Sequence, residues 1–444
     1  MALPPEPSWS PLNQTLRWSF RPLAFLAECR RRHGDAFSVR FLGFERPMVM
    51  ISDPAAIRAL YTEPANGLPP GRNIVLEPIL GPRSVLLLEG AEHLARRRLM
   101  LPPFHGERMR AYEQTVRTAV NREIDSWPLN APFPIHARMQ AITLEVILRA
   151  VFGVHEGPRL DRLRGMLATV LQETASPRAQ IVGLATRRFS ERGPYARFER
   201  QLRAVDELMF AEIAEHRTRP DLAEGDDILA MLMSAEFEDG GAMDDRELRD
   251  QLMTLLLAGH ETTATGLAWT FDLLLRHPEA LARLRDSLAA GEEDYLRATI
   301  SESLRLRPVV PLAGRRLAAP LLAGDLELPA GTDVTPAIWL THTREDLFPD
   351  PLAFRPERFL DGKPDSYAWI PFGGGVRRCL GATFAEFEMR IVLSEVLGRT
   401  SLRKANPAPE QTGRRNITLS PKDGTPVILE SRAPAPEPEP VAVA

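Results

Sequence analysis

The strongest constraint on the fold is a helical pattern that extends over residues 91–307. Apolar residues recur there at spacings of three and four, and the interruptions coincide with proline or glycine, as at His277-Pro278. A chain of 444 residues has a prior of about three domains. The composition does not shift between residues 36 and 430, however, and no linker is visible. We therefore predict one large domain that is mainly α, with small β-sheet regions.

Shorter elements are expected on both sides of this helical pattern. Alternating or continuous apolar residues predict short strands at 37–41, 47–51, 416–419 and 426–429. Ser52-Asp53-Pro54 is typical of a helix start. Residues 64–84 are rich in Pro and Gly and are predicted to form a long loop, whereas 308–378 combines prolines with short strands. A last helix is predicted over residues 380–398.

These patterns divide the chain into three parts. Residues 1–35 are interpreted as an N-terminal segment and residues 36–430 as the folded domain. Residues 431–444 are rich in Pro and Ala, a composition that does not pack, and are predicted to be a disordered tail.

Charge and cysteine content exclude several classes of protein. The net charge is −4, which argues against a nucleic-acid partner because such proteins usually carry a basic excess. Two cysteines, Cys29 and Cys379, are too few and too far apart for a disulfide framework or a structural zinc site. No stretch approaches the roughly 20 apolar residues of a membrane-spanning helix, and no secretory signal is visible. We therefore expect no transmembrane anchor and a cytoplasmic location.

Cys379 lies in a glycine-rich segment, Phe372-Gly-Gly-Gly-Val-Arg-Arg-Cys-Leu-Gly381, at the start of a predicted helix. Glycines let the backbone approach a flat, bulky group, and the helix start with Arg377 and Arg378 favours a thiolate. A thiolate is a soft metal ligand and the axial ligand of one class of haem. From these residues alone two other interpretations stay open, a phosphate-binding loop and a buried, inert cysteine.

A single helix is predicted over residues 244–276, long enough to cross a domain. Its apolar middle leads into Ala258 and Gly259, followed by Glu261 and Thr262. A buried acid is costly unless it is paired or used. The small side chains leave the helix surface bare, so we expect a large planar group to lie against it. The alternative is a kinked helix whose polar face meets water.

Two charged pairs are further candidates for a site. Glu302 and Arg305 are three residues apart and share a helix face, and Arg358 is a candidate third member. His93 and Arg97 are four residues apart, share a helix face and are suited to bind anionic groups by charge-assisted hydrogen bonds. Taken alone, both patterns are also typical of solvated surface charges.

Taken in chain order, these elements resemble the cytochrome P450 family of haem-thiolate monooxygenases over residues 36–430. The haem-binding motif of that family is Phe-x-x-Gly-x-Arg-x-Cys-x-Gly. It is matched at every fixed position, by Phe372, Gly375, Arg377, Cys379 and Gly381. The Ala-Gly-x-Glu-Thr stretch, the Glu-x-x-Arg pair and a Pro-Glu-Arg-Phe segment follow in the family's order. The resemblance implies a single P450-like domain that encloses haem b, iron protoporphyrin IX.

The resemblance also implies roles for these residues. Cys379 matches the axial thiolate of the iron, with Phe372 packed near it. Glu261 and Thr262 match the acid–alcohol pair that handles O2 and delivers protons. Other positions that match contacts to the cofactor are Gly381, Ala258 and Gly259.

Two sets of charged residues receive roles in the same way. Those that match a structural network behind the haem are Glu302, Arg305 and Arg358. Those that match positions binding the haem propionates are His93, Arg97, Arg377 and Arg315. Arg316, beside Arg315, leaves the last assignment open.

For the reaction, the family implies that one atom of O2 enters a C–H bond while the other leaves as water. No Gly-x-Gly-x-x-Gly follows a predicted strand, so the electrons are expected to come from a separate partner. The resemblance to soluble bacterial members of the family, together with the missing anchor, implies a ferredoxin or flavodoxin with its NAD(P)H reductase. A candidate docking patch for it consists of Arg96, Arg98, Arg378 and Arg390. The implied substrate pocket is lined by Leu76, Leu80, Leu255, Val309, Leu312 and Ile417. Its apolar character favours a lipophilic substrate, such as a fatty acid, terpenoid or steroid.

Two alternative functions stay open. A peroxide-driven or rearranging haem-thiolate enzyme needs no electron donor, but such relatives tend to lack the acid–alcohol pair. A non-catalytic haem-binding sensor would have no use for Glu261 and Thr262 over the haem.

Overall fold

The computed structural model describes residues 3–63, 66–68, 72–104, 106, 108–153, 157–174, 194–220, 222–362 and 364–435. The helices are α1 (Pro11–Phe20), α2 (Pro22–His33), α3 (Pro54–Thr62), α4 (Arg72–Leu80), α5 (Gly90–Met100), α6 (Arg108–Asp125), α7 (Ile135–Phe152), α8 (Pro158–Thr174), α10 (Pro194–Arg217), α11 (Ile228–Ser234), α12 (Asp245–Arg276), α13 (Pro278–Ala289), α14 (Asp294–Leu306), α15 (Ile338–His342) and α16 (Ala382–Arg399). The strands are β1 (Ala36–Val39), β2 (Met48–Ile51), β3 (Pro132–Pro134), β4 (Arg315–Arg316), β5 (Leu321–Ala323), β6 (Leu326–Leu328), β7 (Asp333–Pro336), β8 (Thr400–Lys404), β9 (Thr412–Arg415), β10 (Thr418–Pro421) and β11 (Pro426–Arg432).

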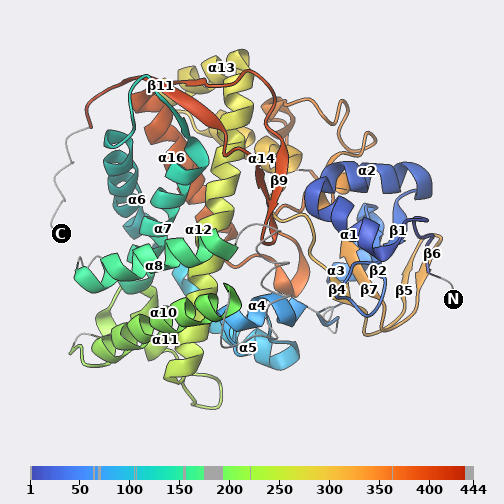
Figure 1. The fold of residues 1–444 in the computed structure, drawn as a ribbon, viewed down its shortest axis with the longest axis horizontal. Helices are drawn as coiled ribbons and strands as arrows, with labels where there is room; N and C mark the ends of the chain where they lie inside the picture. The colour runs from blue at the N-terminus through green and yellow to red at the C-terminus, as the bar shows by residue number, and fades with distance from the viewer. Residues whose placement is uncertain are drawn as a thin grey trace.

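The long helix α12 runs through the helical part of the molecule, and α7, α10, α14 and α16 pack around it (Figure 1). It begins where the sequence predicts, because the side chain of Asp244 accepts a hydrogen bond from the Glu247 amide (2.8 Å). Most of its residues are buried in the main apolar core. The prediction of one helix across the domain is confirmed.

A four-stranded sheet in the order β1-β2-β7-β4 lies at the opposite end of the molecule from α8 and α10 (Figure 1). The first pair is antiparallel, β2 and β7 are parallel, and β4 returns antiparallel. The predicted strand pair and the helix start at Pro54 are both confirmed. The predicted N-terminal segment forms α1 and α2, whose Trp18 and Phe25 share a buried cluster with Phe37 and Met50 of this sheet.

The remaining strands form a three-stranded sheet in the order β3-β11-β8 and two hairpins, β5–β6 and β9–β10. The hairpin β9–β10 lies against the residues after α14, where the Leu419 amide donates a hydrogen bond to the Val309 carbonyl (2.7 Å). Among the described helices, none is long and apolar enough to cross a lipid bilayer.

Two predictions about loops are corrected. Residues 72–80 form α4 instead of a loop, because Leu76 and Leu80 gain a buried cluster with Leu87. At the other end, β11 extends through Arg432, so the first residues of the predicted tail pair with β8. Residues 436–444 of that tail lie outside the described residues.

Candidate functional site

The loop before α16 is shaped by its contact with α3. A Cβ on Gly374 would lie 2.4 Å from the ring of Tyr61, and one on Gly375 would lie 2.2 Å from the Tyr61 carbonyl oxygen. Gly375 also has a φ of +65°, which L-residues rarely adopt. The loop is closed by a hydrogen bond from the Cys379 amide to the Phe372 carbonyl (3.0 Å). Glycine is therefore required at both positions, and the cysteine is held in a fixed place.

Part of Cys379 is exposed, but protein atoms lie close enough to its thiol to shield the sulfur from bulk water. Burial raises the pKa of the Cys379 thiol, while the Gly381 amide and the charges of Arg378 and Arg97 oppose that rise. Of the two arginines predicted to favour a thiolate, Arg378 lowers the pKa of the thiol as expected, together with Arg97 and the Gly381 amide at the start of α16, but burial outweighs them. A coordinating metal ion deprotonates a thiol outright, so the chemistry of this donor suits a metal ligand.

Four cationic or neutral donors gather beside this loop. Burial, and then the charges of Arg377, Arg97 and Arg315, lower the pKa of His93 to about 4. His93 is therefore a neutral, buried imidazole close to three guanidinium groups. Arg377 donates to the Leu88 carbonyl (2.5 Å). The structure thus brings together all four residues that the resemblance links to the propionates.

Arg315 and Arg316 have different surroundings. Arg316 forms an ion pair with Asp333 (2.8 Å). Arg315 is buried, lies over the Tyr61 ring (5.0 Å) and donates to backbone carbonyls such as that of Gly314 (2.8 Å). Arg315 is the member of the pair whose charge reaches His93.

Within the described part of the chain, no carboxylate pairs with His93, Arg97 or Arg315, of which Arg315 is buried and Arg97 is half-buried. Uncompensated buried cations are costly, and guanidinium groups bind carboxylates by strong, charge-assisted hydrogen bonds. An accessible cysteine beside such a cluster fits a haem, which carries an iron and two propionate carboxylates.

On α12, the small residues have two different functions. Ala258 is exposed, and its carbonyl accepts a hydrogen bond from the Thr262 hydroxyl (2.6 Å). A Cβ on Gly259 would instead lie 3.2 Å from Ile147 of α7. The prediction that Gly259 leaves a bare surface for a planar group is wrong, because this glycine allows α7 to pack closely.

Glu261 and Thr262 are consecutive on α12 but have different hydrogen-bond partners. Glu261 is 7% exposed and accepts hydrogen bonds from Gln140 (2.6 Å) and Arg415 (3.1 Å). Burial raises the pKa of Glu261, and Arg415 and Gln140 counteract part of that rise. The acid therefore faces α7 and β9, whereas Thr262 is partly exposed beside Ala258. No hydrogen bond or ion pair within the described part of the chain joins either residue to Cys379.

The predicted network behind the cysteine loop is present. Arg305 and Glu302 have no exposed surface and form a bidentate ion pair (2.6 and 2.8 Å). Arg305 also donates to the carbonyls of His342 and Pro351 (both 2.7 Å). Arg358 Nε lies 3.4 Å from Glu302, an ion pair without hydrogen-bond geometry. The network joins α14 to the end of α15 at His342 and to residues 351–358.

His342 extends this network to the cysteine loop. Its Nε2 accepts a hydrogen bond from the Ile370 amide (2.9 Å), so Nδ1 carries the proton and donates to the Arg305 carbonyl (3.1 Å). Complete burial, with the nearby Arg305 charge, lowers the pKa of His342 to about 3. A neutral imidazole therefore holds Ile370, nine residues before the cysteine, against α14.

This burial predicts a specific pH dependence. An unfolded histidine takes up a proton as the pH falls below about 6.5, whereas folded His342 stays neutral down to about 3. The unfolded state then binds more protons, so stability is lost as the pH falls through this window. We expect His342→Gln to reduce the loss between pH 7 and pH 5 by about 2 kcal/mol. Urea unfolding of wild type and His342→Gln at both pH values measures the loss of unfolding free energy for each protein. An equal loss in the two proteins would contradict the assignment of a neutral, buried imidazole to His342.

The predicted pocket residues have different surroundings. Leu255 and Val309 belong to the main core, and Ile417 is 42% exposed at the turn of the β9–β10 hairpin. Leu80 has no accessible surface, which corrects its placement on a pocket wall. The other two residues belong to different clusters, Leu76 beside α4 and Leu312 against the N-terminal aromatic residues. The hydrogen bond between β10 and Val309 brings Ile417 and Val309 to the same region.

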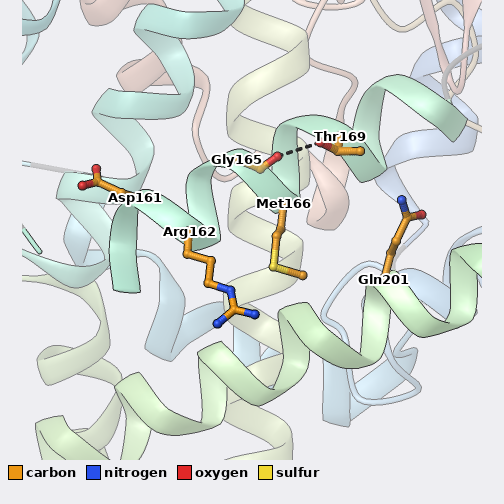
Figure 2. A pocket seen from close by; sticks show the side chains of 6 residues that line it. All are labelled: Asp161, Arg162, Gly165, Met166, Thr169 and Gln201. Carbon is orange, nitrogen blue, oxygen red and sulfur yellow. Dashed lines mark hydrogen bonds between the residues drawn. The ribbon is translucent and has the colours of Figure 1, made fainter. Parts of the chain in front are cut away.

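A groove of about 280 Å³ lies elsewhere, between α8 and α10. Figure 2 shows its lining residues, which are Asp161, Arg162, Gly165, Met166, Thr169 and Gln201. None of them is among the predicted site residues, so this groove is separate from the candidate site.

The predicted docking patch is largely neutralised by ion pairs. Arg96 pairs with Glu247 (2.8 Å). Arg98 and Arg390 pair with Glu238 and Glu293, respectively. Arg378 is exposed and lies in the cysteine loop itself, directly before Cys379.

Three residues that hold the site were not identified from the sequence, namely Tyr61, His342 and Arg415. Each acts on a residue distant in the chain, such as Arg415 on Glu261, 154 positions away. No local spacing identifies such contacts, and the only signal is residue type, an aromatic or a cation beside a strand or helix end.

Comparisons with known proteins agree with this geometry. The family model described as Cytochrome P450 matches residues 4–425. Cytochrome P450 135B1 of Mycobacterium tuberculosis is 41% identical over 431 residues, which cover 96% of this chain and 90% of the relative. Cytochrome P450 138 of the same organism is 36% identical, with 97% of each chain covered.

Solved structures show the same fold. A cyanobacterial P450, CYP120A1, with bound retinoic acid has a TM-score of 0.83 at 24% identity and covers 97% of this chain and 100% of its own. A six-coordinated cytochrome P450 from Thermus thermophilus has a TM-score of 0.71 at 27% identity, with coverages of 92% and 98%. Since the family model spans nearly the whole chain and relatives exceed a third identity, the chain belongs to the cytochrome P450 family, and its cofactor is a protoporphyrin IX haem.

Proposed function

We propose that this haem-thiolate monooxygenase hydroxylates a C–H bond of a lipophilic substrate, a fatty acid, terpenoid or steroid. Its electrons would come from a separate ferredoxin or flavodoxin with an NAD(P)H reductase. The observation that carries the oxygenase chemistry is Cys379, an exposed cysteine whose loop is close to Arg97 and Arg315, for which the described residues supply no carboxylate. The substrate class is supported by Ile417, a large exposed apolar side chain two residues before Leu419, whose amide binds the carbonyl of the core residue Val309.

Haem bound through Cys379 supplies the chemistry that uses O2, two electrons and two protons to convert a C–H bond to C–OH with release of water. The protein's own residues do the positioning. Arg97, Arg315, Arg377 and neutral His93 are suited to hold two carboxylates. Through His342 and Ile370, the Glu302–Arg305 pair keeps the cysteine loop in place.

Glu261 and Thr262 of α12 are the residues that would handle protons. Burial raises the pKa of Glu261, which favours its use as a proton carrier, while Gln140 and Arg415 fix the position of its carboxyl group. Thr262 has its hydroxyl proton directed to the Ala258 carbonyl. Since the two side chains do not touch, a proton passes between them only if Glu261 rotates or a water molecule bridges them.

Thr262→Ala is expected to uncouple O2 consumption from product formation. The hydroxyl beside exposed Ala258 would no longer orient a proton donor, so product per O2 should fall about tenfold and peroxide should rise. Thr270→Ala is the matched control, because Thr270 makes the same bond to the carbonyl of Gly266 on the same helix but is fully buried. Unaltered coupling in Thr262→Ala would count against the monooxygenase role.

Arg97→Gln is expected to weaken haem retention. Loss of one charge-assisted hydrogen bond, about 1.5–3 kcal/mol, corresponds to roughly 10–100-fold faster transfer of haem to an acceptor protein. Arg98→Gln is the control on the same helix, since Arg98 is exposed and paired with Glu238. Equal haem transfer by the two variants would show that Arg97 does not hold the cofactor.

Substrate class and donor are tested on the haem-loaded chain. Absorbance titrations with fatty acids, terpenoids and steroids identify a ligand, and turnover is then measured with ferredoxin, flavodoxin or hydrogen peroxide. Product that requires O2 and a protein donor supports the proposal. Product with peroxide alone, or ligand binding without any turnover, contradicts it in favour of a peroxide-driven enzyme or a sensor, respectively.

A further inference from the structure

Five large apolar side chains gather on the surface of the N-terminal lobe. Leu12, Leu16 and Phe20 lie four residues apart on one face of α1, and Leu42 and Phe44 lie in the turn after β1. Each is 40–54% exposed. Single exposed apolar residues are ordinary, but a contiguous group marks an interaction surface. We call these five residues the N-terminal apolar patch.

The patch is a fixed feature of the fold. The Thr15 hydroxyl on α1 accepts a hydrogen bond from the Leu42 amide (2.8 Å), which places the turn directly beside the helix. Phe44 packs edge-on against Phe41 (6.4 Å), and Phe41 packs against Trp18 of α1 (5.8 Å). The helix therefore buries its other face, and the exposure of its leucines does not come from a detached end.

Basic residues surround the patch. The first 46 residues contain seven arginines and four carboxylates, a net charge of +3 in a chain whose total is −4. Arg17 and Arg21 lie on and directly after α1, and Arg40 and Arg46 flank the turn. All four are exposed, although Arg40 forms an ion pair with Glu6 and Arg17 lies over the Trp9 ring (4.1 Å). The turn also carries one exposed carboxylate, that of Glu45.

We propose that the N-terminal apolar patch inserts into the interfacial region of an anionic lipid bilayer and holds the protein peripherally at its surface. Helices that lie in a membrane interface combine Leu and Phe on one face with arginines at its border. Basic segments are also attracted by the negative potential of anionic lipids. A second copy of the chain fits less well, because a two-fold contact would bring the same arginines of both copies together.

The test uses the haem-loaded full chain and vesicles of phosphatidylcholine, with and without phosphatidylglycerol. We expect co-sedimentation with the anionic vesicles that weakens as salt is added. The double variant L16E/F20E should lower the partition coefficient about tenfold or more, because two large apolar side chains no longer leave water. R17Q/R21Q should lower binding to the anionic vesicles alone, by about fivefold per arginine.

Phe210→Glu is the matched control. Phe210 has a similar exposure of 38% but lies on α10, at the end of the molecule opposite α1 (Figure 1). Unfolding curves and the haem spectrum establish that each variant is folded. The proposal is overturned if wild type fails to bind anionic vesicles, or if L16E/F20E binds as well as wild type or F210E. Self-association that L16E/F20E abolishes, without vesicle binding, would assign the patch to a second copy instead.

Discussion

Cys379→Ser is expected to abolish the thiolate signature in the carbon monoxide difference spectrum of the reduced protein. Serine removes the only sulfur of the loop that the Phe372 carbonyl and the Tyr61 contact hold in place. Loss of a residue that merely orients a metal ligand costs 10–100-fold in affinity or activity. Loss of the ligand itself should therefore lower turnover by more than about 100-fold. Spectra and product formation are measured on the same preparation.

Cys29→Ala provides the matched control for this variant. Cys29 has no exposed surface and packs in the aromatic cluster of the N-terminal lobe, and burial raises the pKa of its thiol to about 12. It is an inert core residue, so its replacement should cost about 1 kcal/mol of stability and leave the spectrum unchanged. A thiolate band that survives in Cys379→Ser would exclude Cys379 as the ligand, and a band that disappears in a folded Cys29→Ala variant would show that its loss is not specific to Cys379.

Elements that are specified by neighbouring residues were predictable. The start of α12 follows from the Asp244 cap, and that of α3 from Asp53 followed by Pro54. Helix α4 was not predictable in this way, since prolines and glycines border it and its stability comes from leucines such as Leu87 that follow later in the chain. Local capping is readable in a sequence, whereas packing between distant segments is not.

The same difference between local and distant contacts explains which residues of the candidate site could be identified from the sequence. Cys379, Arg305 and Arg97 were identifiable because their motifs are contiguous. Gly259 was misinterpreted because its neighbour, Ile147, lies on another helix. His342 carries no motif of its own, and only the folded chain shows that it joins the Arg305 carbonyl to the Ile370 amide.

Arg305→Gln is expected to destabilise the protein by about 3–5 kcal/mol, because it leaves the carboxylate of Glu302 buried without its main partner. The guanidinium group also satisfies the carbonyls of His342, Pro351 and Ala353, which a glutamine cannot reach together. Arg305→Lys should recover only part of the loss, since a lysine offers a single point of charge. Urea unfolding of the haem-loaded wild type and of the two Arg305 variants measures their free energies of unfolding.

Arg31→Gln is the control, because Arg31 and Glu28 have the same spacing of three residues on a helix. That pair is exposed, and Glu28 keeps Arg32 as a partner, so the change should cost less than about 1 kcal/mol. If Arg305→Gln were as mild as Arg31→Gln, the buried pair would not support the cysteine loop. If instead both Arg305 variants lost stability while the thiolate band stayed intact, the network would stabilise the domain without fixing the ligand, and His342 would lose its assigned role as the connection between them.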